Sequence, residues 1–295
     1  MIWLNQLLQG ILLGSYYALL ACGLSFMFGV MRIINLAHGS LAVAAAYGVW
    51  LLADRYELHP FVGLLLVVPL MGVVGWVLHY LVLERSSKAG ELVPILATFG
   101  LAVALDNTMF SVFGADTRSL ANYIDTLAYD GTDVGALTFG HLSLLTFVVS
   151  VGLLGGLHIM LKHTALGRRI RAVADDPDSA QLAGVNAATA NAVASGIAMM
   201  TVAVAGTFLA MRATVDPYAG PPQLIFAFEA VMIGGAGSLW GTLLGGIALG
   251  VAQSLGSQVH PQGFLIAGHV LFLAVLLTRM LLAGRSFKQL FINAK

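Results

Sequence analysis

Charged residues are scarce in this sequence. Only 9% of the 295 residues are Asp, Glu, Lys or Arg, whereas 59% are hydrophobic, and the mean hydropathy is +0.89. Soluble domains carry about 25% charged residues, so this composition excludes an ordinary soluble fold. The 14 basic and 14 acidic side chains cancel, and no basic run is long enough to bind nucleic acid. The composition predicts a polytopic membrane protein in a lipid bilayer.

Several chemical signatures are also missing. Cys22 is the single cysteine, so no internal disulfide can form. The dipeptide Gly-Lys does not occur, which excludes a Walker A phosphate-binding loop, and there is no GxSxG nucleophile elbow. The eight histidines show neither HxxxH nor HExxH spacing. We therefore expect no metal site, no cofactor and no enzymatic activity, which argues against an intramembrane protease.

Long apolar runs make up most of the chain. A helix needs about 20 apolar residues to cross a bilayer. Full spans are expected over residues 7–30, 61–83, 93–113, 142–161, 187–211 and 264–282. The runs 40–53, 224–233 and 242–255 are shorter, so one or two of them are expected to be short or re-entrant. The prediction is an all-α fold of about eight transmembrane helices that forms one membrane domain over residues 1–295.

The basic residues are divided unequally between the two ends of these spans, and Lys and Arg favour cytoplasmic loops. If residues 163–186 and the C-terminal tail are cytoplasmic, the basic residues inside are Arg32, Arg85, Lys88, Lys162, Arg168, Arg169, Arg171, Arg279, Arg285, Lys288 and Lys295. Only Arg55, Arg118 and Arg212 then lie outside. Residues 163–186 become a cytoplasmic loop, and residues 114–140, with four Asp and one Arg, become an external loop.

The polar segment from Thr164 to Asn186 predicts two short helices outside the membrane. Arginines cluster in its first half at Arg168, Arg169 and Arg171. Asp176 suits a helix N-cap, and Pro177 suits the first helical position, where its missing N–H would be unpaired in any case. Gly184 suits the position just after the second helix. An ordinary cytosolic loop with the expected positive charge is the simpler interpretation of this segment.

Two apolar runs are interrupted by small and polar residues, at 35–39 and at 234–241. Non-helical backbone at membrane depth is tolerated where it is buried in protein or lines a watery cavity, and paired breaks in a transporter point to the substrate site. Short turns with glycines that serve close helix packing are the alternative. The glycines expected to serve helix packing or a helix break are Gly10 and Gly14 in the first span, Gly39 in the first break, and Gly234, Gly235, Gly237, Gly241 and Gly245 in or just after the second.

Polar and ionisable residues inside the spans are candidates for a substrate pathway, because such residues are costly in lipid and normally face the protein interior. The candidates are Asn35, His38, Thr98, Asp106, Asn107 and Glu229. Each has a structural alternative. Asp106 is a candidate for a helix end, Glu229 for an ion pair with Arg212, His38 for a structural hydrogen bond, and Thr98 for a bond to its own helix.

Four stretches together resemble the LIV-type ABC-transporter permeases, the inner-membrane subunits of branched-chain amino-acid importers. They are GILLGSYYAL at 10–19 with INLAHG at 34–39, ATFGL at 97–101, GRRIRAV at 167–173 with DPDSA at 176–180 and GV at 184–185, and GGAGS at 234–238 with GTLLGG at 241–246. The similarity extends over nearly the whole chain, and it is greater to the shorter of the two permease types in such systems.

The resemblance implies a multi-pass permease of the bacterial inner membrane that makes no covalent bonds. It implies ATP-driven alternating access for branched-chain amino acids or a related small polar or amphipathic solute. The implied partners are two cytosolic ATPase subunits, a periplasmic binding protein and a second permease, which is either a paralogue or a second copy. The implied contact with the ATPase is a coupling helix that involves Arg168, Arg169, Arg171, Asp176, Pro177, Ala180 and Gly184. A self-contained channel or ion-coupled secondary transporter is the alternative.

Overall fold

The computed structural model describes residues 2–90, 92–135 and 137–282, so the predictions for Arg285, Lys288 and Lys295 lie outside the described residues. The chain is almost entirely helical. The longer helices are α1 (Ile2–Met31), α2 (His38–Tyr56), α3 (Pro60–Leu78), α5 (Val93–Phe113), α6 (His141–His163), α7 (Ala165–Asp175), α9 (Ala187–Arg212), α10 (Gly220–Gly234), α11 (Leu239–Val259) and α12 (Gly263–Leu282). The shorter elements are η1 (His79–Leu83), α4 (Glu84–Ala89), η2 (Ala121–Tyr123), η3 (Asp125–Ala128) and α8 (Pro177–Leu182), with strands β1 (Gly131–Val134) and β2 (Leu137–Gly140).

Seven helical stretches in the described residues are long and apolar enough to cross a membrane, which confirms an all-α polytopic membrane fold. They are α1, the continuous stretch Pro60–Ala89, α5, α6, α9, α11 and α12. Two further helices are shorter, α2 with 19 residues and α10 with 15. The expectation that residues 242–255 form a short run is wrong, because Ser238 caps a 21-residue helix that includes Leu239–Thr242 and extends to Val259.

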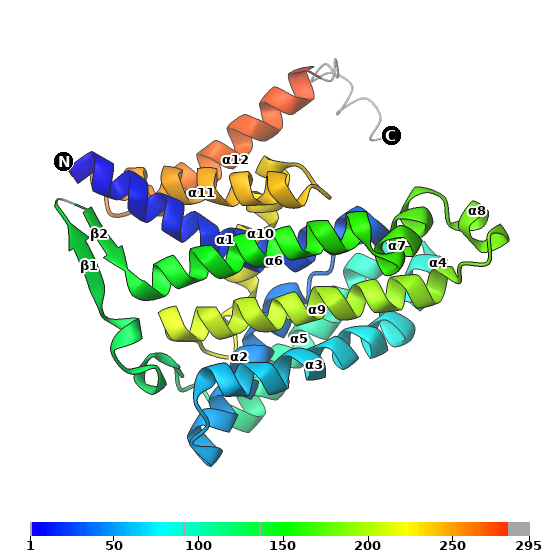
Figure 1. Ribbon diagram of the computed structural model, residues 1–295, viewed down its shortest axis with the longest axis horizontal. Coiled ribbons are helices and arrows are strands. Elements are labelled where there is room, and N and C mark those ends of the chain that lie inside the picture. The colour runs from blue at the N-terminus through cyan, green and yellow to red at the C-terminus, as the bar shows by residue number, and fades with distance from the viewer. Residues whose placement is uncertain (1, 91, 136, 283–295) are drawn as a thin grey trace.

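The bundle has two distinct ends (Figure 1). At one end, which we call the hairpin end, the N-terminus lies beside the antiparallel pair β1–β2. This small hairpin lies in the segment predicted as an external loop, and the sequence analysis did not anticipate it. At the opposite end, the α7–α8 end, helices α4, α7 and α8 lie together. The two ends therefore correspond to the two groups of basic residues on which the predicted orientation depends.

Close helix packing in the core depends on glycine. The longest helix, α1, packs along α11, where Gly10 lies against Val251 and Gly14 against the Gly246 carbonyl. A Cβ atom on Gly10 would lie 2.6 Å from Val251 Cα, so no larger residue fits without separating the helices. Small residues allow membrane helices to approach closely enough for extensive van der Waals contact.

Two parts of the chain are built alike but run in opposite directions. The first arm, residues 2–56, consists of α1, a connector over residues 32–37 and α2; the second arm, residues 187–234, consists of α9, a connector over residues 213–219 and α10. The helix α1 ends beside Pro177 at the α7–α8 end, whereas α9 ends beside the 118–120 segment at the other end. Each connector re-enters the bundle before the shorter helix begins, which is the inverted arrangement found in many transporters.

The two shorter helices begin next to each other inside the bundle. Gly39, in the first turn of α2, contacts the carbonyl of Gly220, the first residue of α10. We call this contact region the junction and define it as residues 38–40 and 220. His38 Nε2 donates to the carbonyl oxygen of Leu20 at 2.8 Å, and Leu20 lies near the middle of α1. The junction is therefore at membrane depth, with two helix N-termini facing one another.

Candidate functional site

Three of the predicted pathway residues surround the start of α2. Asn35 Oδ1 accepts a hydrogen bond from the Ala37 N–H at 3.0 Å, which forms an Asx turn before the helix. The Leu36 N–H donates to Thr98 Oγ1 at 3.0 Å, and the Thr98 hydroxyl donates to the Pro94 carbonyl of its own helix at 2.8 Å. Asn35, His38 and Thr98 are all fully buried. The structural alternatives for His38 and Thr98 are therefore present in the geometry.

Two buried polar atoms at or next to the junction lack partners. Within the described part of the chain, Asn35 Nδ2 and His38 Nδ1 find no hydrogen-bond partner. Buried polar groups are usually paired, so an unpaired group calls for an explanation such as bound water or a ligand. Both atoms lie beside two helix N-termini, whose free N–H groups attract negative or electron-rich groups.

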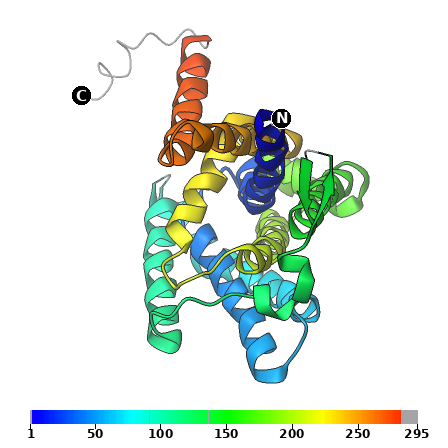
Figure 2. The same ribbon diagram turned by 90° about the vertical axis from the view of Figure 1, so that its left-hand side faces the viewer.

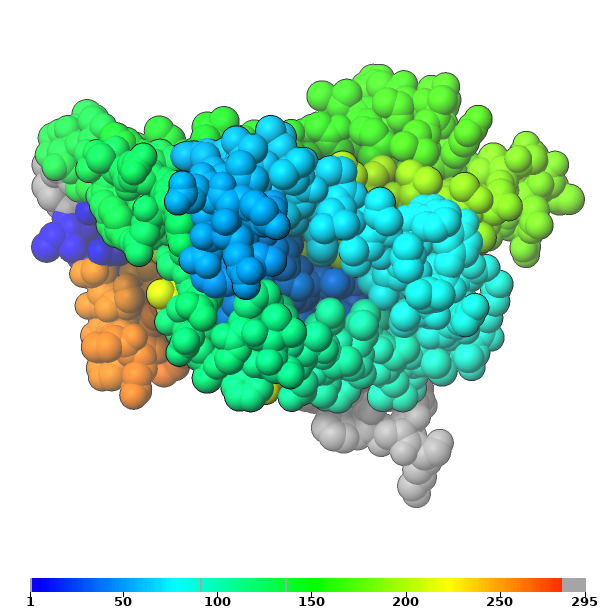
Figure 3. All heavy atoms as spheres, turned by 90° about the horizontal axis from the view of Figure 1, so that it is seen from below, coloured from blue at the N-terminus to red at the C-terminus, as the bar shows by residue number. Residues whose placement is uncertain are grey.

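Asp106 and Asn107 are neighbours on α5 near the second connector, the first buried and the second exposed. Asp106 is 5% exposed, and its carboxyl group lies near Ser40 in the first turn of α2. Asn107 is exposed and its Oδ1 accepts a hydrogen bond from the Tyr218 hydroxyl at 3.3 Å. Figure 3 shows the face formed by α3 and α5, with blue atoms of the N-terminal helices visible in the hollow between them. A carboxylate is thus present at the start of α2.

Glu229 forms a separate polar cluster on the other side of α10. Its Oε1 lies 2.5 Å from Nδ1 of His269 on α12, and the Glu229 side chain is 4% exposed. The expected alternative partner, Arg212, lies instead over the ring of Tyr16, 5.7 Å from its centroid. Nine residues separate Gly220 from Glu229, which corresponds to about 14 Å along a helix. Glu229 is therefore not brought together with the other pathway candidates.

The sequence analysis missed several residues of this second cluster. Tyr17 donates to Gln253 Oε1 at 2.5 Å, and Tyr16 donates to Gln223 Oε1 at 2.8 Å. Glu229 Oε2 and Gln253 Nε2 are buried and have no partner within the described residues. His269 was recognisable in principle, since it is an ionisable residue within an apolar span. No local pattern indicated that it would face Glu229.

The segment predicted for coupling folds as its local signals indicate. Asp176 Oδ1 accepts the N–H groups of Asp178 and Ser179 at 3.1 and 3.2 Å, and Pro177 occupies the first position of α8. The hydrogen bond from the Ser179 hydroxyl, followed by those from the two N–H groups, lowers the pKa of the Asp176 carboxyl below its ordinary value. Gly184 has φ +80°, and the Val185 N–H donates to the Ala180 carbonyl at 2.9 Å. This is the glycine-terminated end that favours a fixed helix stop.

One side of this segment packs against the bundle, and the other side is exposed. Ala180 on α8 packs with Val173 on α7 and Ala190 on α9. The three arginines Arg168, Arg169 and Arg171 are exposed, as is Leu182 at the end of α8, with a relative exposure of 91%. Figure 1 shows α8 as the outermost element of its end.

The second glycine-rich break forms a tight turn between α10 and α11. Gly235 and Gly237 have φ values of +100° and +84°, which side chains rarely allow. Gly234 contacts the Gly241 carbonyl, and Gly245 contacts the Ala230 carbonyl. Arg279 Nη2 donates to the Ile233 carbonyl at 2.9 Å. The glycines here serve both the turn and the close packing of the two helices.

No group of three or more His, Cys, Asp or Glu side chains that could hold a metal ion occurs among the described residues.

Comparison with known proteins identifies the family. Residues 6–283 match the family described as the permease component of the branched-chain amino acid transport system. The chain belongs to this permease family. The high-affinity branched-chain amino acid permease protein BraD of Pseudomonas aeruginosa is 26% identical over 96% of both chains. A probable branched-chain amino acid permease, LivH of Methanocaldococcus jannaschii, is 28% identical over 95% of this chain and 90% of its own.

The chain is also similar to a permease named for another solute. The fructose import permease protein FrcC of Rhizobium meliloti is 28% identical over 82% of this chain and 69% of its own. No solved structure matches this permease. The resemblance inferred from the motifs is therefore confirmed at the level of the family, and the chain is a multi-pass transport permease of that type.

Proposed function

We propose that this chain is the membrane-spanning subunit of a binding-protein-dependent ABC importer and that ATP hydrolysis on separate subunits drives it. The α7–α8 segment carries this proposal. It is held rigidly by caps at both ends of α8 and by the contacts of Ala180. Three arginines and Leu182 remain exposed on it for a partner. A rigid, partly apolar projection suits transmission of a mechanical push to the helices α6 and α9 on either side.

In the proposed contact, α7 and α8 have different roles. On α7, Ile170 and Val173 are buried against the bundle, which leaves the arginines facing outward. On α8, Leu182 is the apolar group that enters a pocket of the ATPase. Apolar anchors in the centre of an interface typically dominate its binding energy, and surrounding charges guide association. The cytosolic location of this end follows from the distribution of basic residues and remains part of the proposal.

The solute pathway is proposed to run past the junction. At or near the junction, Asn35, His38 and Asp106 each have a buried polar atom without a partner among the described residues, and Thr98 and Asn107 lie close by. Two helix N-termini at membrane depth are suited to a solute with a carboxylate or another electron-rich group. We propose branched-chain amino acids or a related small amphipathic solute, supplied by a periplasmic binding protein at the hairpin end. Glu229 is kept as a proposed pathway residue.

Two experiments test the coupling assignment. Arg168→Glu combined with Arg171→Glu is expected to abolish substrate-stimulated ATP turnover by the assembled transporter while the protein still inserts in the membrane. Leu182→Asp is expected to do the same, whereas Leu182→Met keeps an apolar side chain and retains coupled uptake. Lys162→Glu is the control for charge reversal at the same end. Normal coupled uptake by the double arginine variant would refute the docking assignment.

The alternative of a self-contained channel or ion-coupled carrier makes an opposite prediction. Proteoliposomes that contain only this chain are expected to show no solute uptake, and uptake is expected once the ATPase subunits, second permease and binding protein are added. Uptake by the chain alone would remove the ABC-importer proposal. For Glu229, the variant Glu229→Ala is expected to alter the solute range or rate more than the yield of assembled complex, and unchanged uptake kinetics would exclude this residue from the pathway.

A further inference from the structure

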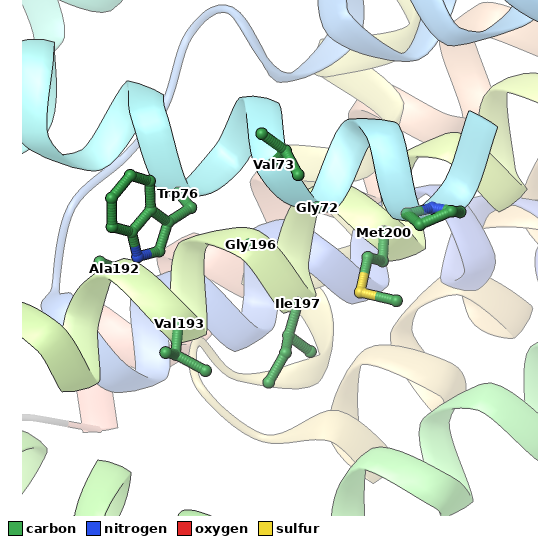
Figure 4. Close-up of a pocket in the computed structure, with 9 residues that line it drawn as sticks. Gly72, Val73, Trp76, Ala192, Val193, Gly196, Ile197 and Met200 are labelled. Carbon is green, nitrogen blue, oxygen red and sulfur yellow. The ribbon is translucent and has the colours of Figure 1, made fainter. Parts of the chain in front are cut away.

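A continuous furrow runs along one face of α9. In the membrane it is an apolar groove of about 360 Å³ between α3 and α9, with Trp76 at one end and Met200 at the other (Figure 4). The two helices cross closely at Gly72 and Gly196, where a Cβ on Gly196 would lie 2.9 Å from the Gly72 carbonyl oxygen. Val193 lines this groove and also lines a second hollow, of about 450 Å³, at the α7–α8 end.

The second hollow is more polar than the first. It is bounded by Leu166 and Arg169 of α7, by the 183–186 turn and by Thr189 of α9. Thr189, Val193, Ile197 and Met200 follow one another at helical spacing, so they form one stripe along α9. The furrow thus begins with an exposed guanidinium and a hydroxyl and continues between apolar side chains.

The dimensions of this furrow fit one half of a bilayer. Thr189 and Met200 are eleven residues apart, which corresponds to about 16 Å along an α-helix. The hydrocarbon core of a bilayer is about 30 Å thick, so one leaflet supplies chains of about 15 Å. Trp76 and Tyr80 also contact each other here, with ring centroids 4.9 Å apart, and Trp76 lies towards the polar end of the furrow. Aromatic rings of this kind favour the membrane interface.

We propose that this furrow is a binding site for one anionic phospholipid of the leaflet at the α7–α8 end. The acyl chain lies in the apolar groove between α3 and α9. The phosphate lies beside Arg169, with the Thr189 hydroxyl as a second donor. The predicted orientation, in which basic residues face the cytosol, makes this the cytosolic leaflet. The lipid contacts α7 and the 183–186 turn directly, so it supports the base of the segment that carries α8.

The experiment reports on lipid next to Trp76. The chain has four tryptophans, and substitution of Trp3, Trp50 and Trp240 by Phe leaves Trp76 as the only tryptophan of this chain. A variant that also carries Trp76→Phe gives the background from the accompanying subunits. The variant, purified with the subunits that accompany it, is placed in bilayers that contain brominated phosphatidylglycerol or brominated phosphatidylcholine, and fluorescence quenching is measured. One arginine near the surface contributes about 1 kcal/mol for anionic lipid, so a preference of about fivefold for phosphatidylglycerol is expected.

Variants identify the source of the preference. Arg169→Gln is expected to remove it, whereas Lys162→Gln, which removes an exposed positive charge at the same end but away from the furrow, is expected to leave it unchanged. The tryptophan replacements include the buried Trp50. A second measurement therefore avoids them: native mass spectrometry of retained phosphatidylglycerol on the otherwise unmodified chain and on its Arg169→Gln variant.

Three results would overturn the proposal. Equal quenching by the two lipids in the parent protein would show an unselective lipid surface. A preference that survives Arg169→Gln would place the headgroup elsewhere. Absence of quenching by either lipid in the assembled complex would show that a protein partner covers the furrow.

Discussion

The two arms of the molecule solve one structural problem with different side chains. Each has a long helix, a re-entering connector with an Asx turn, and a shorter helix that begins at the junction. The first connector uses Asn35, whose Oδ1 accepts from the Ala37 N–H; the second uses Asp216, whose Oδ1 accepts from the Tyr218 N–H at 2.8 Å. An Asx turn supplies the backbone hydrogen bond that neither helix can supply at that point.

The arms differ in how firmly the shorter helix is enclosed. Most of α2 is buried among α3, α5, α9 and α10. In α10 only Gly220, Ala227, Glu229, Ala230 and Val231 are buried. Side chains of α12 hold α10 at two places, through His269 and Arg279, and α12 itself projects away from the bundle (Figure 2). The shorter helix of the second arm is therefore held by close packing against α11 and by polar contacts with α12, whereas that of the first arm is enclosed by packing along most of its length.

The largest effect is expected at the junction, where both arms meet. Gly39→Ala places a methyl group against the Gly220 carbonyl, and Gly220→Ala places one 2.6 Å from the Ser40 N. Because the contacts are with backbone, the helices must separate, at a cost of at least about 1–3 kcal/mol typical of an overpacked core. Thermal unfolding in detergent is expected to show a lower midpoint for both variants.

The matched control for these variants is Gly48→Ala, also on α2. A Cβ there would lie 3.6 Å from Val67 Cγ2, which is an ordinary contact. Alanine is favoured over glycine in a helix by about 0.5–1 kcal/mol, so the midpoint is expected to stay the same or rise. If Gly220→Ala lowered the unfolding midpoint no more than Gly48→Ala does, the start of α10 would not be as tightly packed as the start of α2. The comparison of the arms would then fail.

The next effect tests the contact that only the second arm has. His269→Ala leaves the buried carboxylate of Glu229 without its partner, at a cost of about 1–3 kcal/mol for an unpaired buried group. The lower part of that range is expected, because the His269 side chain is 45% exposed. Adding Glu229→Gln is expected to restore part of the lost stability in the same thermal assay.

The exposed His158 on α6 provides a control, since His158→Ala removes an imidazole without leaving a buried charge. An equal loss of stability in His158→Ala and His269→Ala would mean that α12 does not hold α10 through Glu229.

Local sequence signals predicted some parts of this structure and not others, for a physical reason. The caps Asp176, Pro177 and Gly184 act on N–H and C=O groups within a few residues, so their roles are readable from a short window. Apolar runs likewise fixed most of the spans. The start of α11 was missed because its cap, Ser238, follows a glycine turn that resembles a longer break.

The sequence identified individual polar residues of the sites but not which of them pair. Asn35 and Thr98 come together through the Leu36 N–H, across 62 residues of chain, and His269 meets Glu229 across 40. Such pairings depend on which helices pack together, and nearly uniform apolar runs carry little information about neighbours. The furrow along α9 was not anticipated for the same reason, because it is made by the crossing of α3 and α9.

A smaller effect distinguishes the two Asx turns. Asn35→Asp keeps the acceptor for the Ala37 N–H but introduces a charge at a fully buried position, so a lower thermal midpoint and reduced expression are expected. Asp216→Asn also keeps the acceptor, and it removes a charge from a half-buried connector, so it is expected to be close to neutral. Equal tolerance of both changes would indicate that the first connector is as accessible to water as the second.

The smallest effect is expected in α8, which lies outside both arms and is held by local capping and by the contacts of Ala180. Asp176→Ala removes the acceptor for the Asp178 and Ser179 N–H groups, and faster amide exchange at these two residues is expected without a shift in the global midpoint.

The pKa of the Asp176 carboxyl is lowered in the folded chain, chiefly by the Ser179 hydroxyl. Its contribution is therefore complete above the ordinary carboxyl pKa and is lost as the pH falls through the lowered folded value. The exchange difference between the parent chain and Asp176→Ala should disappear in that acidic range, and Asp176→Asn, which still accepts a hydrogen bond, should show no comparable pH dependence. A difference that persists at the lowest pH would mean that α8 is held by Ala180 and Val185 rather than by its cap.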